Sequence, residues 1–280
     1  MATSTRKTIT HPNGQVTAYI SDKCIDTQRQ AETIMIQHGF ARNAEHFQHW
    51  IPLSQHYDIV RRELRGHGQS SYPKPGQDYD YSTITIVDEI VDTLDQLGLE
   101  KVHFLGESTS GMLAEIFAAT YPDRVASITI CSSPTHLPLH AQHFLAFGLE
   151  SWPAACRKLG SRGWAERLAA APGTVASDDP EFLRQWVDQV AISSGEGLAG
   201  YAEFLSNLDA RPYLPMVGVP TLILAPTNSA MVTLESMQEL AAQVPKATLK
   251  VIKSQGHEIY IEAAQECQEA LLVFLAGHRS

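Results

Sequence analysis

The chain has 280 residues, of which 31 are acidic and 21 are basic, and its formal net charge is −10 with histidine neutral. Apolar residues make up 44% and charged residues 19%, which is the composition of a globular protein rather than a disordered one. The acidic balance argues against nucleic acid or an anionic membrane surface as the main partner. The apolar runs fall short of the roughly 18–20 residues of a membrane span, and the first residues contain no apolar signal core. We therefore expect a cytoplasmic protein that acts on a small molecule, and composition leaves its oligomeric state open.

The first elements expected are two strands, over 7–9 and 16–20, which flank a turn containing Asn13-Gly14 and so predict a hairpin. Downstream, short apolar runs alternate with segments of helical periodicity. Strands are expected over 33–36, 57–64, 102–105, 125–131, 221–225 and 248–252, and helices over 84–97, 110–121, 234–244 and 263–276. Strands separated by helices of this length predict a mainly parallel sheet covered by helices on both faces.

The stretch 139–214 interrupts this alternation, because it contains helical patches but no convincing strand. We expect it to be a helical cap between two parts of an α/β core, 1–138 and 215–280. Three of the four tryptophans lie in this stretch. They could form the cap's own core or line a pocket beneath a lid, and the two roles are compatible. Trp152 and Trp164, together with Met231, are the pocket candidates.

The segment 105–111, Leu-Gly-Glu-Ser-Thr-Ser-Gly, is the most informative part of the sequence because it joins an expected strand to an expected helix. In that context Ser108 can lie on a sharp turn with its hydroxyl at the carboxyl edge of the sheet, as a nucleophile. Small residues are needed two positions before and after it, and Gly106 and Ser110 meet this need. The usual pattern, G-x-S-x-G, has a second glycine where this chain has Ser110. The alternative is a small-residue turn that only connects two elements.

A second segment, His38-Gly39-Phe40, directly follows the expected strand over 33–36. Such a turn can direct the backbone N–H of Phe40 at the same oxygen as the backbone N–H of Thr109, which together would form an oxyanion hole. His38 itself is expected to be a structural residue of the turn.

His257 lies in a loop after the last expected strand. A loop histidine is more often an ordinary surface residue. Its place after the nucleophile and after the last strand instead favours a general base that takes the proton of Ser108 and returns it to a leaving group.

Taken together, these segments resemble the α/β-hydrolase superfamily, in particular its esterases, lactonases and enol-lactonases. The resemblance covers nearly the whole chain and rests on six segments in order: His38-Gly39, R-G-H-G-Q-S at 65–70, the turn at Ser108, Y-P-D-R-V at 121–125, V-P-T-L at 219–222, and Gly256-His257. It implies an eight-stranded sheet, a helical cap between the sixth and seventh strands, and a Ser–acid–His site without a cofactor.

The chain departs from this pattern at the acid. The loop after the seventh expected strand, 225–232, has no carboxylate, and Ser229 takes the acid's position by spacing, preceded by Asn228. Either could orient His257, although a neutral side chain cannot stabilise the imidazolium by charge. Glu107 and Glu258, each next to a site residue, are less favoured candidates, and a carboxylate from elsewhere in the fold stays open.

A metal site is not expected, because neither His46 and His49 nor the histidines over 136–143 are joined by enough further ligands. Glu63 stands where the family usually has aspartate, and we expect it to bind local backbone groups.

The leading hypothesis is a hydrolase of an ester or lactone of small to medium, apolar character, with Ser108 as nucleophile and His257 as base and then acid. Two alternatives use the same fold. One is a lyase, cyclase or cofactor-free oxygenase in which His257 removes a proton from the substrate. The other is a ligand-binding member with little or no catalysis.

Overall fold

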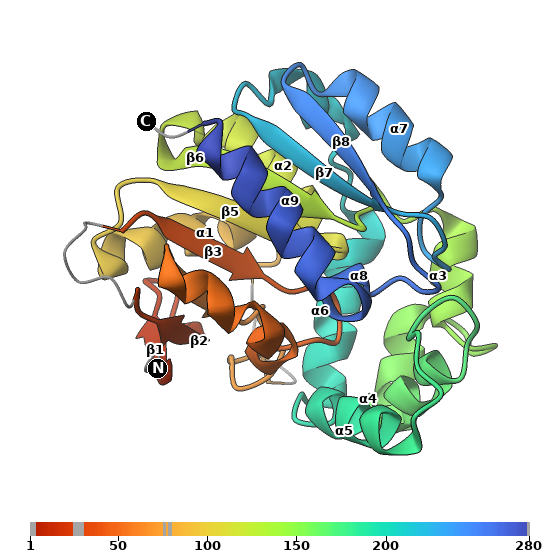
Figure 1. The fold of residues 1–280 in the computed structure, drawn as a ribbon. Coiled ribbons are helices and arrows are strands. Elements are labelled where there is room, and N and C mark those ends of the chain that lie inside the picture. The colour runs from red at the N-terminus through yellow and green to blue at the C-terminus, as the bar shows by residue number, and fades with distance from the viewer. Residues whose placement is uncertain (1–3, 25–30, 75–76, 78–79, 279–280) are drawn as a thin grey trace.

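The computed structural model describes residues 4–24, 31–74, 77 and 80–278. One sheet runs through the molecule with the strand order β1-β2-β4-β3-β5-β6-β7-β8 (Figure 1). Its strands are β1 (Ser4–Thr10), β2 (Val16–Asp22), β3 (Thr33–Gln37), β4 (Asp58–Arg62), β5 (Val102–Glu107), β6 (Val125–Cys131), β7 (Thr221–Pro226) and β8 (Ala247–Ile252). The β1–β2 and β2–β4 pairs are antiparallel and the remaining pairs are parallel, which confirms the expected mainly parallel sheet of eight strands.

Helices cover the sheet on both faces, and two separate apolar clusters fill the space between them. On one face are α1 (Thr83–Leu97), α2 (Thr109–Thr120) and α7 (Leu234–Gln243). On the other are the 3-10 segment η1 (Ala44–Gln55) and the helices α8 (Ile259–Glu262) and α9 (Ala264–Ala276). Figure 1 shows α9, in dark blue, crossing the face of the sheet that is nearer to the viewer. The parallel strands are buried on both sides, as such sheets require.

The sequence of α1 explains both its ends and its packing. The side chain of Ser82 accepts a hydrogen bond from the backbone N–H of Thr85 and so caps the first turn. Gly98 ends the helix in the left-handed conformation, with φ +67°. Apolar residues repeat at helical spacing on the buried face, at Ile86, Val87, Ile90 and Leu94.

Four helices lie between β6 and β7 in the chain: α3 (Leu139–Leu145), α4 (Trp152–Ala169), α5 (Pro180–Val190) and α6 (Gly195–Asn207), followed by the short η3 (Arg211–Met216). Figure 1 shows α4 and α5 to one side of the sheet. Helix α4 packs against α5 and α6, and it kinks at Gly160, where φ is +66°. The backbone of α6 approaches the loop after β4 closely, since a Cβ on Gly66 would lie 2.5 Å from the carbonyl oxygen of Gly197. The two glycines allow this contact between helix and core.

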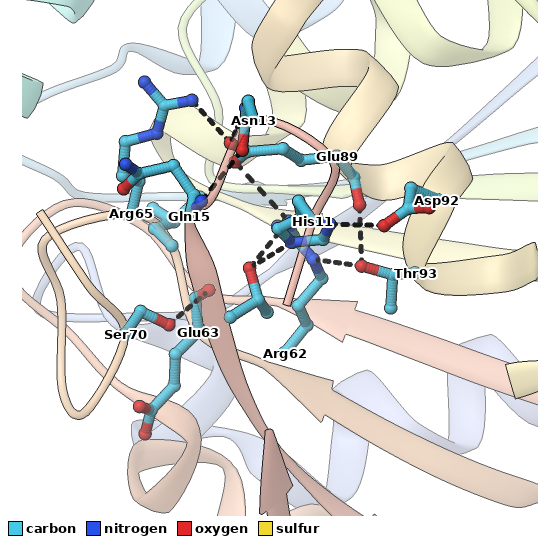
Figure 2. Close-up of polar contacts among 12 residues, drawn as sticks. His11, Asn13, Gln15, Arg62, Glu63, Arg65, Ser70, Glu89, Asp92 and Thr93 are labelled. Atoms are coloured by element: carbon cyan, nitrogen blue, oxygen red, sulfur yellow. Dashed lines mark hydrogen bonds and ion pairs between the residues drawn. The ribbon is translucent and has the colours of Figure 1, made fainter. Parts of the chain in front are cut away.

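A buried polar network holds the loop after β4 against α1 (Figure 2). The guanidinium of Arg65 donates to the Glu89 carboxylate at 2.5 Å, and that of Arg62 donates to the Thr93 hydroxyl at 3.1 Å. Arg62, Arg65 and Glu89 are all less than 5% exposed. Buried charges are tolerated only when they are paired in this way, so the network fixes the position of the 65–70 segment.

The expected elements match the structure to within a few residues. Outside the helical stretch between β6 and β7, three further elements were not predicted: η1, the short η2 (Pro122–Arg124) and α8. All four cysteines, Cys24, Cys131, Cys156 and Cys267, are free thiols. Within the described ranges, each helix is too short or too polar to serve as a membrane span.

Candidate active site

Ser108 lies on a strained turn between β5 and α2. Its φ is +51°, a region that residues other than glycine rarely adopt. The turn brings strand and helix so close that a Cβ on Gly106 would lie 2.2 Å from the carbonyl oxygen of Ser110. The sharp turn thus explains why the sequence needs glycine at position 106. It also places the Ser108 side chain at the carboxyl edge of the sheet.

Ser110 has a contact of its own where the usual pattern has glycine. Its hydroxyl donates a 2.6 Å hydrogen bond to the carbonyl oxygen of His38. The Ser108 turn also packs tightly against Gly39 in the loop after β3, because a Cβ on Gly39 would lie 2.7 Å from the Cβ of Ser108. The departure from G-x-S-x-G therefore joins the Ser108 turn to the loop after β3.

The structure brings Ser108, His257 and Ser229 together, although they lie in three distant loops. Nε2 of His257 is 2.9 Å from Oγ of Ser108, and Nδ1 of the same ring is 2.9 Å from Oγ of Ser229. When Nε2 accepts the Ser108 proton, Nδ1 carries the ring hydrogen and donates it to Ser229. Ser229 Oγ also accepts the backbone N–H groups of Met231 at 3.0 Å and Val232 at 3.2 Å. A hydroxyl thus occupies the third position of a Ser–His site.

The other candidates for that third position do not contact Nδ1. The Asn228 side-chain amide donates instead to the carbonyl oxygen of Gln255 at 2.7 Å. Glu258 is turned away and binds Arg42 instead. Glu107 is near the other ring nitrogen, Nε2, with its Oε1 atom 3.9 Å from that nitrogen. No carboxylate of the described residues therefore binds Nδ1.

His257 is buried, and its loop is held by the segment between α4 and α5. Its backbone N–H donates to the carbonyl oxygen of Thr174 at 2.9 Å, and the N–H of Ala230, beside Ser229, donates to the carbonyl oxygen of Gly173 at 2.8 Å. Burial, and then the positive charge of Arg42, lower the pKa of His257 to about 3. The ring is therefore neutral at rest and can accept a proton.

The two backbone N–H groups expected at the oxyanion hole, those of Phe40 and Thr109, belong to residues that lie in contact. Phe40 N–H is turned toward α2 and donates to the Thr109 hydroxyl at 3.1 Å. Thr109 is the first residue of α2, so its own N–H is one of the helix's unpaired donors. Negative charge is favoured at such a helix end.

A small cavity opens at these residues, with a volume of about 40 Å³. Trp152, Trp164 and Met231, the pocket residues proposed from the sequence, all line it. The remaining lining residues are Phe40, Arg42, Ser108, Thr109, Leu145, Leu168, Thr174 and His257. Apolar side chains thus dominate the wall, and Ser108 and His257 face the same space.

Two residues near the site have structural contacts, as expected. His38 donates from Nδ1 to the carbonyl oxygen of Gly39 at 2.8 Å and accepts the N–H of Leu64 at Nε2. The Glu63 carboxylate accepts the N–H of Gln69 at 2.7 Å and binds Arg6 at 2.9 Å. Neither faces the cavity, so both serve the fold.

The family model described as the alpha/beta hydrolase fold matches residues 32–264. The chain belongs to the α/β-hydrolase family. It is 23% identical over 251 residues to 3-oxoadipate enol-lactonase 2 of Acinetobacter baylyi, covering 87% of this chain and 88% of that protein.

Solved structures of this fold are similar over almost the whole hydrolase chain. The enol-lactonase of Burkholderia xenovorans LB400 has a TM-score of 0.84 at 22% identity and covers 96% of this chain and 100% of its own. A thermophilic esterase of Thermogutta terrifontis has a TM-score of 0.79 at 21% identity, covering 98% and 100%. At this identity the two structures establish the shared fold.

This α/β hydrolase also has a group of buried contacts at the site that was not found from the sequence. Arg42 donates from Nε to Glu258 Oε1 at 2.5 Å, and Trp186 Nε1 donates to Glu258 Oε2 at 3.0 Å. The guanidinium also lies over the Trp186 ring, 4.6 Å from its centre. Arg42 and Glu258 are 216 residues apart in the chain, and no spacing rule connects them. The group places one buried cation, Arg42, at the cavity wall and pairs it with the buried carboxylate of Glu258.

Proposed function

We propose that the protein hydrolyses a carboxylic ester or lactone through an acyl-enzyme on Ser108. The observation that carries the proposal is the 2.9 Å separation between Ser108 Oγ and Nε2 of His257, a neutral base. A serine activated in this way is the nucleophile of acyl transfer. Similarity to an enol-lactonase over 87% of the chain supports the same class of reaction.

The proposed reaction has two balanced steps. Ser108 Oγ bonds to the substrate's carbonyl carbon while its proton passes to Nε2 of His257, and the carbonyl oxygen becomes an oxyanion. The C–O bond to the leaving group then breaks, and the leaving oxygen takes the proton from Nε2. Water repeats the sequence on the acyl-enzyme and releases the acid.

The oxyanion would be bound by the backbone N–H groups of Phe40 and Thr109. For it to bind at Phe40, the Thr109 hydroxyl has to leave the N–H that it now accepts at 3.1 Å. One such donor is worth about 3–4 kcal/mol of transition-state stabilisation in another serine hydrolase. Ser229 would hold the ring of His257 in the tautomer that leaves Nε2 free to accept.

The proposed substrate is apolar around the carbonyl and small to medium in size. The tryptophans Trp152 and Trp164 and the neighbouring leucines form most of the cavity wall. We assign residues 139–214 as a cap that covers the pocket, and 1–138 with 215–280 as the core that holds the nucleophile and base. No step of the proposal requires a cofactor.

The proposal is tested by treating the protein with a fluorophosphonate and mapping the adduct by mass spectrometry. We expect labelling at Ser108 in the wild type and little labelling in His257→Ala, with hydrolysis of p-nitrophenyl acetate lost in Ser108→Ala. A folded protein that is not labelled would contradict serine hydrolysis. If Ser108→Ala kept turnover of a substrate that His257→Ala lost, the result would favour His257 as a base acting directly on the substrate.

A further inference from the structure

The proposed reaction places a positive charge on His257 that Ser229 cannot balance. When Nε2 takes the proton of Ser108, the ring becomes an imidazolium inside a site where His257 is only 4% exposed. In a Ser–His–acid site, the buried acid stabilises this cation. Here a hydroxyl stands at Nδ1, 2.9 Å away, and Arg42 adds a second positive charge nearby. A negative charge has to come from another direction.

Glu107 lies on the other side of the ring. It is the last residue of β5, directly before the nucleophile, and is 1% exposed. Its Oε2 atom accepts the backbone N–H of Gly39 at 2.7 Å, which fixes the carboxylate at the end of the strand. Its Oε1 atom then lies 3.9 Å from Nε2 of His257. At that separation an ionised carboxylate and an imidazolium attract strongly in a buried site.

The second buried carboxylate of the site, that of Glu258, is already paired with other side chains. Glu258 accepts hydrogen bonds from the guanidinium of Arg42 and from Nε1 of Trp186. It therefore neutralises Arg42, and within the described ranges Glu107 is the carboxylate that comes into ion-pair range of the His257 ring.

We propose that Glu107 replaces the missing acid of the triad by stabilising protonated His257 from the Nε2 side. The inference rests on the proposed function. Glu107 does not accept the proton: that proton moves from Ser108 to Nε2 and then to the leaving oxygen, while the carboxylate stays ionised 3.9 Å away. Glu107 acts through His257 and is a positioning residue rather than a catalytic one.

This arrangement makes the activity dependent on the ionisation of Glu107. Burial, opposed by the charge of Arg42, raises the pKa of Glu107 to about 7. The titratable and charged groups that face it from neighbouring elements are Arg42, Cys131, His257, Glu258 and Tyr260. His257 stays neutral over the same range because its pKa is lowered to about 3. The group that changes charge near neutral pH is therefore Glu107, and activity should rise as it ionises.

The test is kcat/KM for p-nitrophenyl acetate between pH 5.5 and 8.5 in the wild type and in Glu107→Gln. Glutamine keeps an oxygen that can accept the Gly39 N–H. We expect the wild type to rise with an apparent pKa near 7, and the variant to match it near pH 5.5 but to fall at least about 10-fold below it at pH 8.5. Glu115→Gln, which removes a different buried glutamate, should keep the wild-type profile. An equal loss at every pH, or no loss at all, would overturn the proposal.

A second readout does not depend on turnover or on a variant of Glu107. In protein labelled with ¹⁵N-histidine, the ring nitrogen resonances of His257 should shift between pH 6 and pH 8 as Glu107 ionises, with His257→Ala used for assignment. Constant resonances over this range would overturn the role of Glu107 even in an active protein. If the resonances shift but Ser108 neither reacts with a fluorophosphonate nor supports hydrolysis, the proposed function fails while the coupling stands.

Discussion

Phe40 and Thr109 are joined by a hydrogen bond from the backbone N–H of Phe40 to the Thr109 hydroxyl, 3.1 Å long. The donor that would bind an oxyanion is therefore occupied at rest. Among the described residues no acceptor is found for the hydroxyl hydrogen of Thr109 itself. A substrate's carbonyl oxygen would have to compete with this hydroxyl for the Phe40 N–H.

The competition predicts that removing the hydroxyl increases activity. A hydrogen bond of this kind contributes about 0.5–1.5 kcal/mol net, so Thr109→Ala should raise kcat/KM for p-nitrophenyl acetate about 2- to 10-fold. Thr109→Ser keeps the hydroxyl and should behave like the wild type. A fall in the alanine variant alone would show instead that the hydroxyl donates to the oxyanion.

Ser229 already occupies the contacts that a carboxylate would need. It lies 2.9 Å from Nδ1 of His257 and accepts the N–H groups of Met231 and Val232. Replacing the acid of a Ser–His–Asp triad by a neutral side chain lowers kcat by about 10⁴. Ser229→Asp should therefore raise kcat at least about 10-fold and make Glu107→Gln less harmful, because the ring then has a second negative partner.

The matched variant for this prediction is Ser229→Ala, which removes the acceptor at Nδ1 without adding charge. Its kcat should fall below that of the wild type, since the ring can then rotate or change tautomer. Steady-state measurements of kcat at pH 8, with alanine, serine or aspartate at position 229, test this order. If alanine, serine and aspartate gave equal rates, Ser229 would have no part in orienting His257.

The fold could be predicted from the sequence because its signals are local. The period of apolar residues in α1, with Ser82 before it and Gly98 after it, defines a helix without any tertiary information. Segment η1 was missed because Pro52 lies inside it and Phe47 has non-helical angles, so its pattern has no regular period. Short, kinked helices of this kind are specified by packing on the sheet.

The site could be predicted only where it follows from chain order. Ser108 and His257 were found because Ser108 directly follows β5 and His257 lies in the loop after β8, and the carboxyl ends of parallel strands meet at one edge. By spacing Ser229 takes the acid's position, but Asn228 before it stayed a candidate, since neighbouring residues of a loop point in directions that sequence does not fix. The Arg42–Glu258 pair joins residues 216 positions apart, and its partners become visible only in three dimensions.

The loop between α4 and α5 should control the position of His257. A Cβ on Gly256 would lie 2.6 Å from the carbonyl oxygen of Thr174, the acceptor of the His257 N–H. Gly256→Ala should therefore displace this contact and lower kcat/KM about 10-fold or more, since misplacement of a catalytic group by about 1 Å can cost 10²-fold. Gly218→Ala is the control, because the nearest atom to its Cβ is 4.0 Å away. Equal rates in both variants would show that the loop does not hold the base.

The free energy of unfolding should depend on pH through Glu115. Its two carboxylate oxygens are buried on α2 without a hydrogen-bond partner in the described structure. Burial raises the pKa of this carboxyl well above its ordinary value of 4.5. The unfolded chain releases the proton above pH 4.5 while the folded protein retains it, so this group lowers the free energy of unfolding as pH rises. The slope is up to about 1.4 kcal/mol per pH unit until the folded pKa is reached.

Glu115→Gln removes the ionisation at nearly constant volume. We expect the variant to gain stability over the wild type between pH 5 and pH 8, by an amount that grows with pH, because only the wild type loses the proton on unfolding. Urea unfolding of both proteins at the two pH values measures the difference, and contributions from the other buried groups cancel in it. A difference that stays constant with pH would mean that Glu115 is ionised in the folded protein and bound to a partner.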